Sequence, residues 1–316
     1  MKRALVLSGG GCKGAFEVGA IEYLLKKESL DFHIFTGTSV GALNAAFLGQ
    51  ARNRHELLAI AEDLKELWLG LKGNHSIYKT SRLGIFKLIF GDSLYKPIGL
   101  QNLIRSKINL RRLFDPATII KISAVALETG ELFYADSRNE ELHEDFLSYI
   151  LASASMPLFF PAVPIAGKHW YDGGLRDITP LEAAFKEHPD EIVVIITNPL
   201  GSRFEAVLPQ VKPGGAIRVI LRTIEILLSE IATNDLQLVR AINKYWWKYT
   251  TKKPMPIRII APQSPLAGEH ALDFNPDSIR ENMHRGWEAA KNPRLLLVNN
   301  LRKKTASIIL PFNQQT

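Results

Sequence analysis

The sequence has a single cysteine, Cys12, so no disulfide can form within the chain. It has no apolar run that approaches the length of a membrane-spanning helix, about 18 residues. The apolar stretch after the first three residues meets glycines too soon for a signal peptide. Internal repeats, low-complexity tracts and Gly/Ser linkers are absent as well. We therefore expect one cytoplasmic domain that spans residues 1–316.

What the chain does have is apolar residues and an excess of positive charge. Hydrophobic residues make up 46% of the 316 positions, which is enough for the core of a large α/β domain. The formal net charge is +7 and the pI is near 9.3, a balance that suits an anionic membrane or a nucleic acid. A solvated basic surface explains the same numbers, because net charge does not show where charges cluster.

Strand and helix patterns alternate at the start of the chain. Short apolar runs bounded by turn residues predict strands, and two pairs of them flank a glycine turn as hairpins do. Longer stretches with apolar residues at helical spacing predict helices. The alternation predicts an α/β fold with a central, mostly parallel but mixed sheet and helices on both faces. The expected strands are 4–8, 32–36, 119–127, 131–135, 162–165, 169–171, 191–197 and 257–261, and the expected helices include 15–27, 42–48, 217–249 and 276–290.

Three consecutive glycines, Gly9 to Gly11, separate the first predicted strand from the first predicted helix. Such a loop either wraps a nucleotide phosphate or offers backbone N–H groups to an anion that exists only during a reaction. The nucleotide interpretation fails on detail. A P-loop needs Gly-Lys-Ser/Thr, but here Lys13 precedes Gly14, and the acid that a dinucleotide site needs after the second strand is missing.

The second predicted strand runs directly into Gly37-Thr38-Ser39-Val40-Gly41 and then into a helix. This G-x-S-x-G pattern is typical of a nucleophile elbow, a sharp turn that exposes the serine hydroxyl at the C-terminal edge of a sheet. Gly37 and Gly41 permit the tight turn. So short a pattern also arises by chance, and the strand–turn–helix setting is what favours a nucleophilic Ser39.

A nucleophilic serine needs a base, and the sequence offers both histidines and a carboxylate. In an α/β-hydrolase a late histidine would serve, but His270 lies in a loop-like stretch and His284 on a predicted helix surface. Asp172 follows a short predicted strand and precedes Gly173 and Gly174, which permit a sharp turn around its carboxylate. Asp-Gly-Gly alone is also an ordinary turn, so Asp172 gains weight only from the other motifs.

Taken together, these motifs resemble the patatin-like phospholipases, lipid acyl hydrolases with a Ser-Asp dyad. The segment from Gly9 to Gly14 is similar to the family's glycine-rich oxyanion loop, Gly37 to Gly41 to its nucleophile elbow, and Asp172-Gly173-Gly174 to its D-G-[AG] motif. Residues 152–157 resemble the segment that precedes that motif, and 273–290 are similar to the closing helix. The resemblance covers a core of about residues 1–200, and we expect 201–316 to pack on it within a single patatin-like domain.

The resemblance implies a three-layer α/β/α fold and the cleavage of fatty acyl esters through an acyl-enzyme, with no metal and no cofactor. The activity would be of the phospholipase A, lysophospholipase or carboxylesterase type. Ser39 would be the nucleophile and Asp172 the general base. Backbone N–H groups of Gly10, Gly11 and Cys12 would form the oxyanion hole.

The chain departs from the family pattern in two places. Cys12 occupies a position where a small residue such as alanine is usual. Positive potential from the loop N–H groups and Lys13 would lower the pKa of its thiol and make it reactive toward maleimide. Ile178-Thr179 stands where the family commonly has an asparagine, which leaves the hydrogen bonding of that loop open.

Two other functions stay open. An acyltransferase on a related fold would need a histidine partner for the serine, and no histidine has a comparable setting. A non-catalytic lipid-binding protein would have no need of all three motifs. We expect a fatty acyl ester or phospholipid as the substrate and no nucleic acid partner, while head group, acyl chain length and oligomeric state stay open.

A membrane contact is expected near residues 240–253. There the lysines and Arg240 recur every four residues, while Trp246 and Tyr249 fall on another side of the predicted helix. A basic face beside an aromatic face suits an anionic lipid surface and a cytoplasmic protein that binds membranes peripherally. A core helix with a solvated face has the same pattern.

Overall fold

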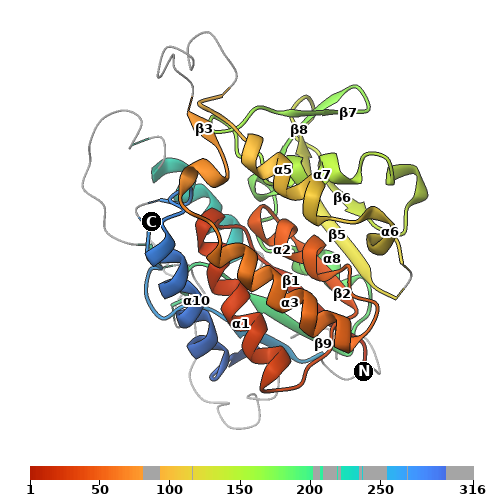
Figure 1. The fold of residues 1–316 in the computed structure, drawn as a ribbon, viewed down its shortest axis with the longest axis vertical. Helices are drawn as coiled ribbons and strands as arrows, with labels where there is room; N and C mark the ends of the chain where they lie inside the picture. Colours follow the sequence, from red (N-terminus) through yellow and green to blue (C-terminus); the bar gives the residue numbers. More distant parts are fainter. Residues whose placement is uncertain are drawn as a thin grey trace, which may run out of the picture.

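The computed structural model describes residues 1–80, 93–115, 117–201, 207–208, 219, 222–234, 237, 255–268 and 270–296. Within these residues a nine-stranded sheet has the order β11-β10-β9-β1-β2-β5-β8-β7, with β6 paired to β5 (Figure 1). Its strands are β1 (Arg3–Leu7), β2 (Ile34–Gly37), β5 (Ile119–Ala126), β6 (Leu132–Asp136), β7 (Val163–Ile165), β8 (Lys168–Asp172), β9 (Glu191–Ile195), β10 (Ile257–Ile260) and β11 (Arg294–Leu295).

The centre of the sheet is parallel and its flanks are antiparallel. Strand β1 pairs in parallel with β2 and β9, β2 with β5, and β9 with β10. Strand β5 pairs antiparallel with β6 and β8, and β7 with β8. Both predicted hairpins are present, and Gly130 and Gly167 at their turns have φ values of 68° and 76°, which favour glycine.

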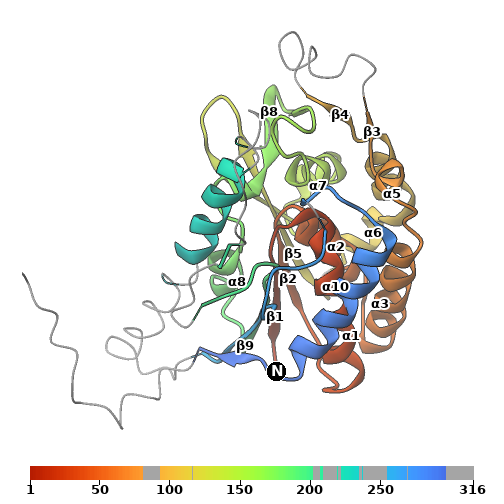
Figure 2. The same ribbon diagram turned by 90° about the vertical axis from the view of Figure 1, so that its left-hand side faces the viewer.

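Helices cover both faces of the sheet. One face carries α1 (Gly14–Lys26), α2 (Val40–Leu48), α3 (Arg54–Leu69) and α10 (Pro276–Ala290), and the other carries α8 (Leu181–Phe185) (Figure 2). The other labelled elements are η1 (Gly11–Lys13), η2 (Asn74–Ser76), β3 (Lys79–Thr80), β4 (Tyr95–Lys96), α5 (Ile98–Lys107), α6 (Leu110–Leu113), η3 (Glu140–Leu142), α7 (Phe146–Ser153) and η4 (Gly173–Leu175). This three-layer arrangement confirms the predicted fold class.

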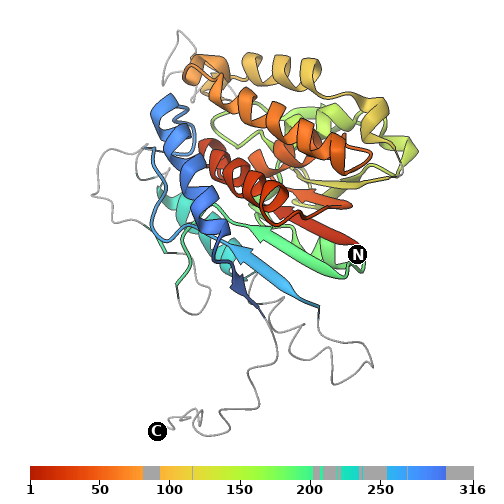
Figure 3. The ribbon, with the colours of Figure 1, turned by 60° about the horizontal axis from the view of Figure 1, so that its bottom comes forward.

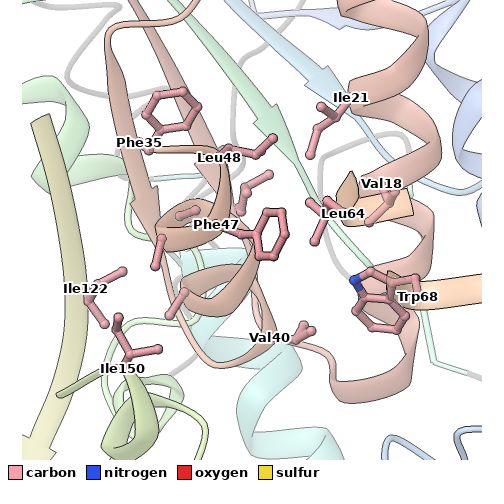
Figure 4. Packing of buried hydrophobic residues seen from close by; sticks show 14 of the residues in the cluster. Val18, Ile21, Phe35, Val40, Phe47, Leu48, Leu64, Trp68, Ile122 and Ile150 are labelled. Atoms are coloured by element: carbon pink, nitrogen blue, oxygen red, sulfur yellow. The ribbon is translucent and has the colours of Figure 1, made fainter. Parts of the chain in front are cut away.

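Alternate residues of β1 enter two separate cores. Leu5 and Leu7 belong to the larger core beneath α1, α2 and α3, which Figure 4 shows around Phe35, Phe47 and Leu64. Ala4 and Val6 point to the smaller core beneath α8. A strand buried on both faces needs a continuous apolar run, which is why residues 4–7 lack the polar alternation of a half-exposed strand.

Helix α10 packs directly against α1, although more than 200 residues separate them in sequence (Figure 3). The contact depends on close backbone approach. A Cβ at Gly19 of α1 would collide with the carbonyl of Met283, and one at Gly286 of α10 with the carbonyl of Phe16. The segment that resembles the family's closing helix is therefore part of the packed core.

The predicted helix over 217–249 is only partly within the described residues. Residues 219, 222–234 and 237 are helical. The proposed membrane contact at 240–253 lies outside the described residues, and that the chain forms one domain stays a prediction. No helix that the structure describes is long and apolar enough to cross a membrane.

Candidate active site

The three sequence motifs meet at one edge of the sheet. Leu7, the last residue of β1, pairs with Gly37 at the end of β2, and Gly37 pairs with Ile122 of β5. Asp172, the last residue of β8, pairs with Ala124 of the same β5 strand. The glycine loop, the serine elbow and Asp172 therefore lie together beyond the carboxyl ends of the parallel strands, where α/β sheets commonly bind ligands.

Ser39 occupies a strained turn between β2 and α2. Its φ and ψ are 57° and −125°, a conformation that non-glycine residues rarely adopt and that costs about 1–3 kcal/mol. Hydrogen bonds hold it in place: the Ser39 N–H donates to Ser153 Oγ (3.0 Å), and the Gly41 N–H donates to the Thr38 carbonyl (2.9 Å). A Cβ at Gly41 would collide with the carbonyl of Leu7, so the turn requires glycine there.

A buried polar network that sequence reasoning missed supports this turn. Thr38 Oγ1 donates to the carbonyl of Asp177 (2.9 Å) and lies 2.6 Å from Ser123 Oγ. The Asp177 carboxylate accepts hydrogen bonds from the Tyr134 hydroxyl and from the Thr179 N–H (3.1 Å). Asp177 thus makes hydrogen bonds in the loop where the family commonly has an asparagine and this chain does not. The Asp-x-Thr spacing, typical of a side-chain-capped turn, is the only local signal for it.

Asp172 is almost entirely buried and lines the same cavity as Ser39. Burial raises the pKa of its carboxyl from 3.8 to about 7, against the opposing effects of the Gly174 N–H and the Ser39 side chain. The Gly174 N–H donates to Oδ1 over 2.8 Å. The carboxyl therefore changes charge near neutral pH, where a general base is most effective.

The glycine loop bends over this pair. Gly11 has a φ of 59°, and a Cβ there would collide with the carbonyl of Ala271, so only glycine fits. In the described part of the chain, the N–H groups of Gly10 and Gly11 donate to no protein acceptor, and both residues line the cavity above Ser39. These two groups are available to an anion.

Cys12 does not have the environment that the sequence predicted. Its N–H donates to the carbonyl of Ala271 over 2.7 Å and is therefore engaged outside the oxyanion position. Its thiol is buried and contacts the carbonyl of His270 (3.4 Å). Burial raises the thiol pKa to about 11 and outweighs the lowering effect of Lys13. The predictions of a third donor and of a reactive thiol are both wrong.

The two late histidines are both exposed to solvent. His270 is exposed at the rim of the cavity, and its Nδ1 accepts a hydrogen bond from the Leu272 N–H (3.2 Å). His284 is exposed on α10. Among the residues described, none of the hydrogen bonds links a histidine to Ser39 or Asp172, and no group of three or more metal-binding side chains gathers.

A cavity of about 670 Å³ opens above the pair. Ser39, Asp172 and the glycine loop form its floor, and most of its other lining is apolar. Its polar rim includes Lys13, whose Nζ lies 3.4 Å from Asn198 Oδ1 and 3.9 Å from a Glu225 oxygen. Sequence reasoning missed this rim, because Asn198 and Glu225 are distant in sequence from every motif.

The fold and this site define a class of α/β/α proteins with a serine elbow that faces a buried aspartate beneath a glycine loop. Residues 5–185, more than half of the chain, match the family model described as patatin-like phospholipase. The chain belongs to that family, as its motifs predicted.

The chain is similar to two curated proteins. The uncharacterized protein YjjU of Escherichia coli (strain K12) is 25% identical over 202 residues, which cover 62% of this chain and 52% of YjjU. The uncharacterized protein YqhO of Bacillus subtilis (strain 168) is 28% identical over 212 residues, 61% of this chain and 70% of YqhO. The matched region therefore spans about half the length of the first relative.

Two solved structures are similar at low identity. VipD from Legionella pneumophila has a TM-score of 0.45 at 12% identity, over 92% of this chain and 66% of that one. The type III effector protein ExoU has a TM-score of 0.32 at 12% identity, over 93% of this chain and 54% of that one.

The burial of Cys12 predicts that maleimide does not modify the native protein at neutral pH. The thiol is enclosed, and its pKa of about 11 leaves it protonated. Mass spectrometry after maleimide treatment, with and without denaturant, measures this. We expect an adduct only on the unfolded chain. Rapid, complete modification of the native protein would contradict the buried position of Cys12.

The raised pKa of Asp172 predicts that Asp172→Asn becomes increasingly more stable than the wild type as the pH rises from about 4 to about 7. In this range the folded wild type retains a proton that the unfolded chain has released, so the wild type loses stability while the amide does not titrate. The difference is up to about 4 kcal/mol. Melting temperatures of both proteins across this range measure it.

Asp136 provides the matched control. Burial raises its pKa, but the hydrogen bonds and charges of Arg138 and Lys121 lower it overall. Its charged form therefore stabilises the fold above the ordinary carboxyl pKa. The wild type should gain on Asp136→Asn only as the pH rises toward about 4, and the difference should stay level from there to about 7. If the stability difference between Asp172→Asn and the wild type were constant with pH, or changed with pH as the Asp136→Asn difference does, the assigned burial of the Asp172 charge would be contradicted.

Proposed function

We propose that this protein hydrolyses fatty acyl esters of lipids, with Ser39 as the nucleophile and Asp172 as the general base. The observation that carries the proposal is that Ser39 and the buried Asp172 line one largely apolar cavity, with the serine side chain close enough to lower the pKa of the carboxyl. A serine becomes nucleophilic when a base lies within hydrogen-bond reach. An apolar cavity favours a substrate with an acyl chain.

The first half of the reaction forms an acyl-enzyme. Ser39 Oγ attacks the ester carbonyl carbon, and its proton passes to the Asp172 carboxylate. The carbonyl oxygen becomes an anion, which accepts hydrogen bonds from the N–H groups of Gly10 and Gly11. When the intermediate collapses, the bond to the alcohol oxygen breaks, and Asp172 returns its proton to the departing alcohol.

The second half releases the fatty acid. Asp172, again a carboxylate, takes a proton from a water molecule that attacks the acyl carbon. The same two N–H groups stabilise the second tetrahedral anion. The bond to Ser39 Oγ then breaks, and Asp172 restores the serine proton. Both half-reactions need Asp172 in its charged form, which predominates only above a pH of about 7.

Two features of the surroundings support this division of roles. The strained elbow keeps Ser39 at the cavity floor, and the Thr38–Ser123–Asp177 contacts fix the elbow relative to the loop that follows Asp172. The Gly9 N–H donates to the Ile178 carbonyl (3.0 Å), which joins the glycine loop to the same segment. The nucleophile, base and anion donors are thus held by one connected set of hydrogen bonds, as preorganised sites require.

The proposal predicts that Ser39→Ala and Asp172→Asn each lower ester hydrolysis by at least about 10⁴-fold, because neither residue has a substitute at the site. The assay uses a panel of simple acyl esters, phospholipids and lysophospholipids, and circular dichroism checks the fold of each variant.

His270→Ala and His284→Ala are the matched controls, and both should retain most activity. If either histidine variant lost activity while Asp172→Asn kept it, a conventional triad would replace the dyad. If the wild type bound the lipids but turned over none of them, a non-catalytic lipid-binding function would replace the enzyme.

A further inference from the structure

The cavity extends away from Ser39 along one face of α2. The α2 side chains that line it are Val40, Leu43, Asn44 and Phe47, which recur at helical spacing. Ser39 is the N-cap of this helix, so Phe47 lies about 12 Å further along its axis at a rise of about 1.5 Å per residue. The reacting serine thus stands at one end of a long apolar wall.

Two further helices supply walls of the same space. Helix α5 contributes residues at the spacing of a single helical stripe, and α3 and the residue pair after it contribute another. We refer to the space between these walls as the α2–α5 limb. Its lining residues are Val40, Leu43, Asn44 and Phe47 from α2, Leu64, Leu67, Trp68 and Leu71 from the α3 segment, and Leu100, Leu103, Ile104, Lys107 and Ile108 from the α5 segment.

The far end of the limb is identified by contacts between α2 and α5. Gln50, which follows α2, donates from Nε2 to the Lys107 carbonyl (3.2 Å), and the Asn109 N–H donates to Gln50 Oε1 (2.8 Å). The C-terminal ends of the two helices therefore meet near Phe47. Lys107 is exposed there, so the apolar wall ends at an ammonium group and water.

The polar side chains within the limb are internally paired. Asn44 donates from Nδ2 to Glu17 Oε2 (2.8 Å), and its Oδ1 accepts a hydrogen bond from Trp68 Nε1 (3.1 Å). Glu17 is fully buried, and burial raises its pKa well above the ordinary value. Asn44 and Trp68 therefore leave no unpaired amide or indole group toward the cavity, and the wall suits a hydrocarbon.

From this geometry we infer that the α2–α5 limb binds the acyl chain of the substrate and sets its preferred length, with Leu103 as a specificity-determining residue. The inference rests on the proposed function, since it assumes that the acyl carbon is bonded to Ser39. A chain that starts at Ser39 follows the apolar face of α2. Methylenes beyond Phe47 and Lys107 leave the limb and gain no further burial.

The test is a series of soluble butyrate, octanoate, dodecanoate and palmitate esters of one alcohol. While the chain stays inside the limb, kcat/KM rises by about fourfold for each methylene, and it levels off once the chain passes the end. Leu103→Trp fills the limb and lowers the dodecanoate-to-butyrate ratio of kcat/KM by at least about tenfold. Asn102→Trp, an exposed neighbour on the same helix that does not line the cavity, leaves the ratio unchanged.

A binding measurement separates this inference from the proposed function. Bromine quenches a nearby indole, so bromododecanoate bound in the limb quenches Trp68, and the quenching is lost in Trp68→Phe. Quenching of Trp68 without any ester turnover would support binding of the acyl chain in the limb and contradict the proposed hydrolase function. The inference about the limb would be overturned if ester turnover depended on Ser39 but the dodecanoate-to-butyrate ratio of kcat/KM were equal for Leu103→Trp and Asn102→Trp. If Leu103→Trp does not fold, Leu103→Ala serves instead: it widens the limb and raises the palmitate-to-dodecanoate ratio, and an unchanged ratio overturns the inference.

Discussion

The site depends on one carboxylate held out of water beside one hydroxyl. Asp172 accepts a hydrogen bond from the Gly174 N–H and lies beside the Ser39 side chain. Among the described residues, no cation offsets the burial that raises its pKa to about 7. Burial of this charge is unfavourable for folding, but it brings the pKa of the proposed general base close to neutral pH. The strained turn at Ser39 adds a second local cost, and the surrounding fold stabilises both.

The sheet explains how the fold tolerates these costs. The parallel centre places the ends of β1 and β2 next to each other, and the antiparallel strand β8 returns Asp172 to the same edge through β5. Thr38, Ser123 and Asp177 then fix the elbow by buried hydrogen bonds. Two cores, one on each face of β1, hold this frame rigid. Buried polar networks of this kind are stabilising only when fully paired, which ties their residues to one geometry.

Much of this was predictable because the essential groups lie in short, local motifs. Strand–turn–helix context made Ser39 the candidate nucleophile, and turn chemistry made Asp172 and the glycine loop its candidate partners. The errors at Cys12 have a different origin: its N–H bonds to Ala271, and its thiol is covered by the same distant segment, a contact that no local pattern encodes. The α2–α5 limb was unpredictable for the same reason. Phe47, Leu103 and Trp68 lie on three different helices, and no local pattern shows that these side chains line one cavity.

The pH dependence of Ser39 phosphonylation by an uncharged fluorophosphonate tests the dyad most directly, because it requires no knowledge of the lipid substrate. The account predicts that the rate constant for labelling rises as the pH passes through about 7, then levels off. Mass spectrometry should place the adduct on Ser39, and Asp172→Asn should be labelled slowly at every pH. A rate that is independent of pH across this range, or an Asp172→Asn protein labelled as fast as the wild type, would contradict the assignment of Asp172 as the base.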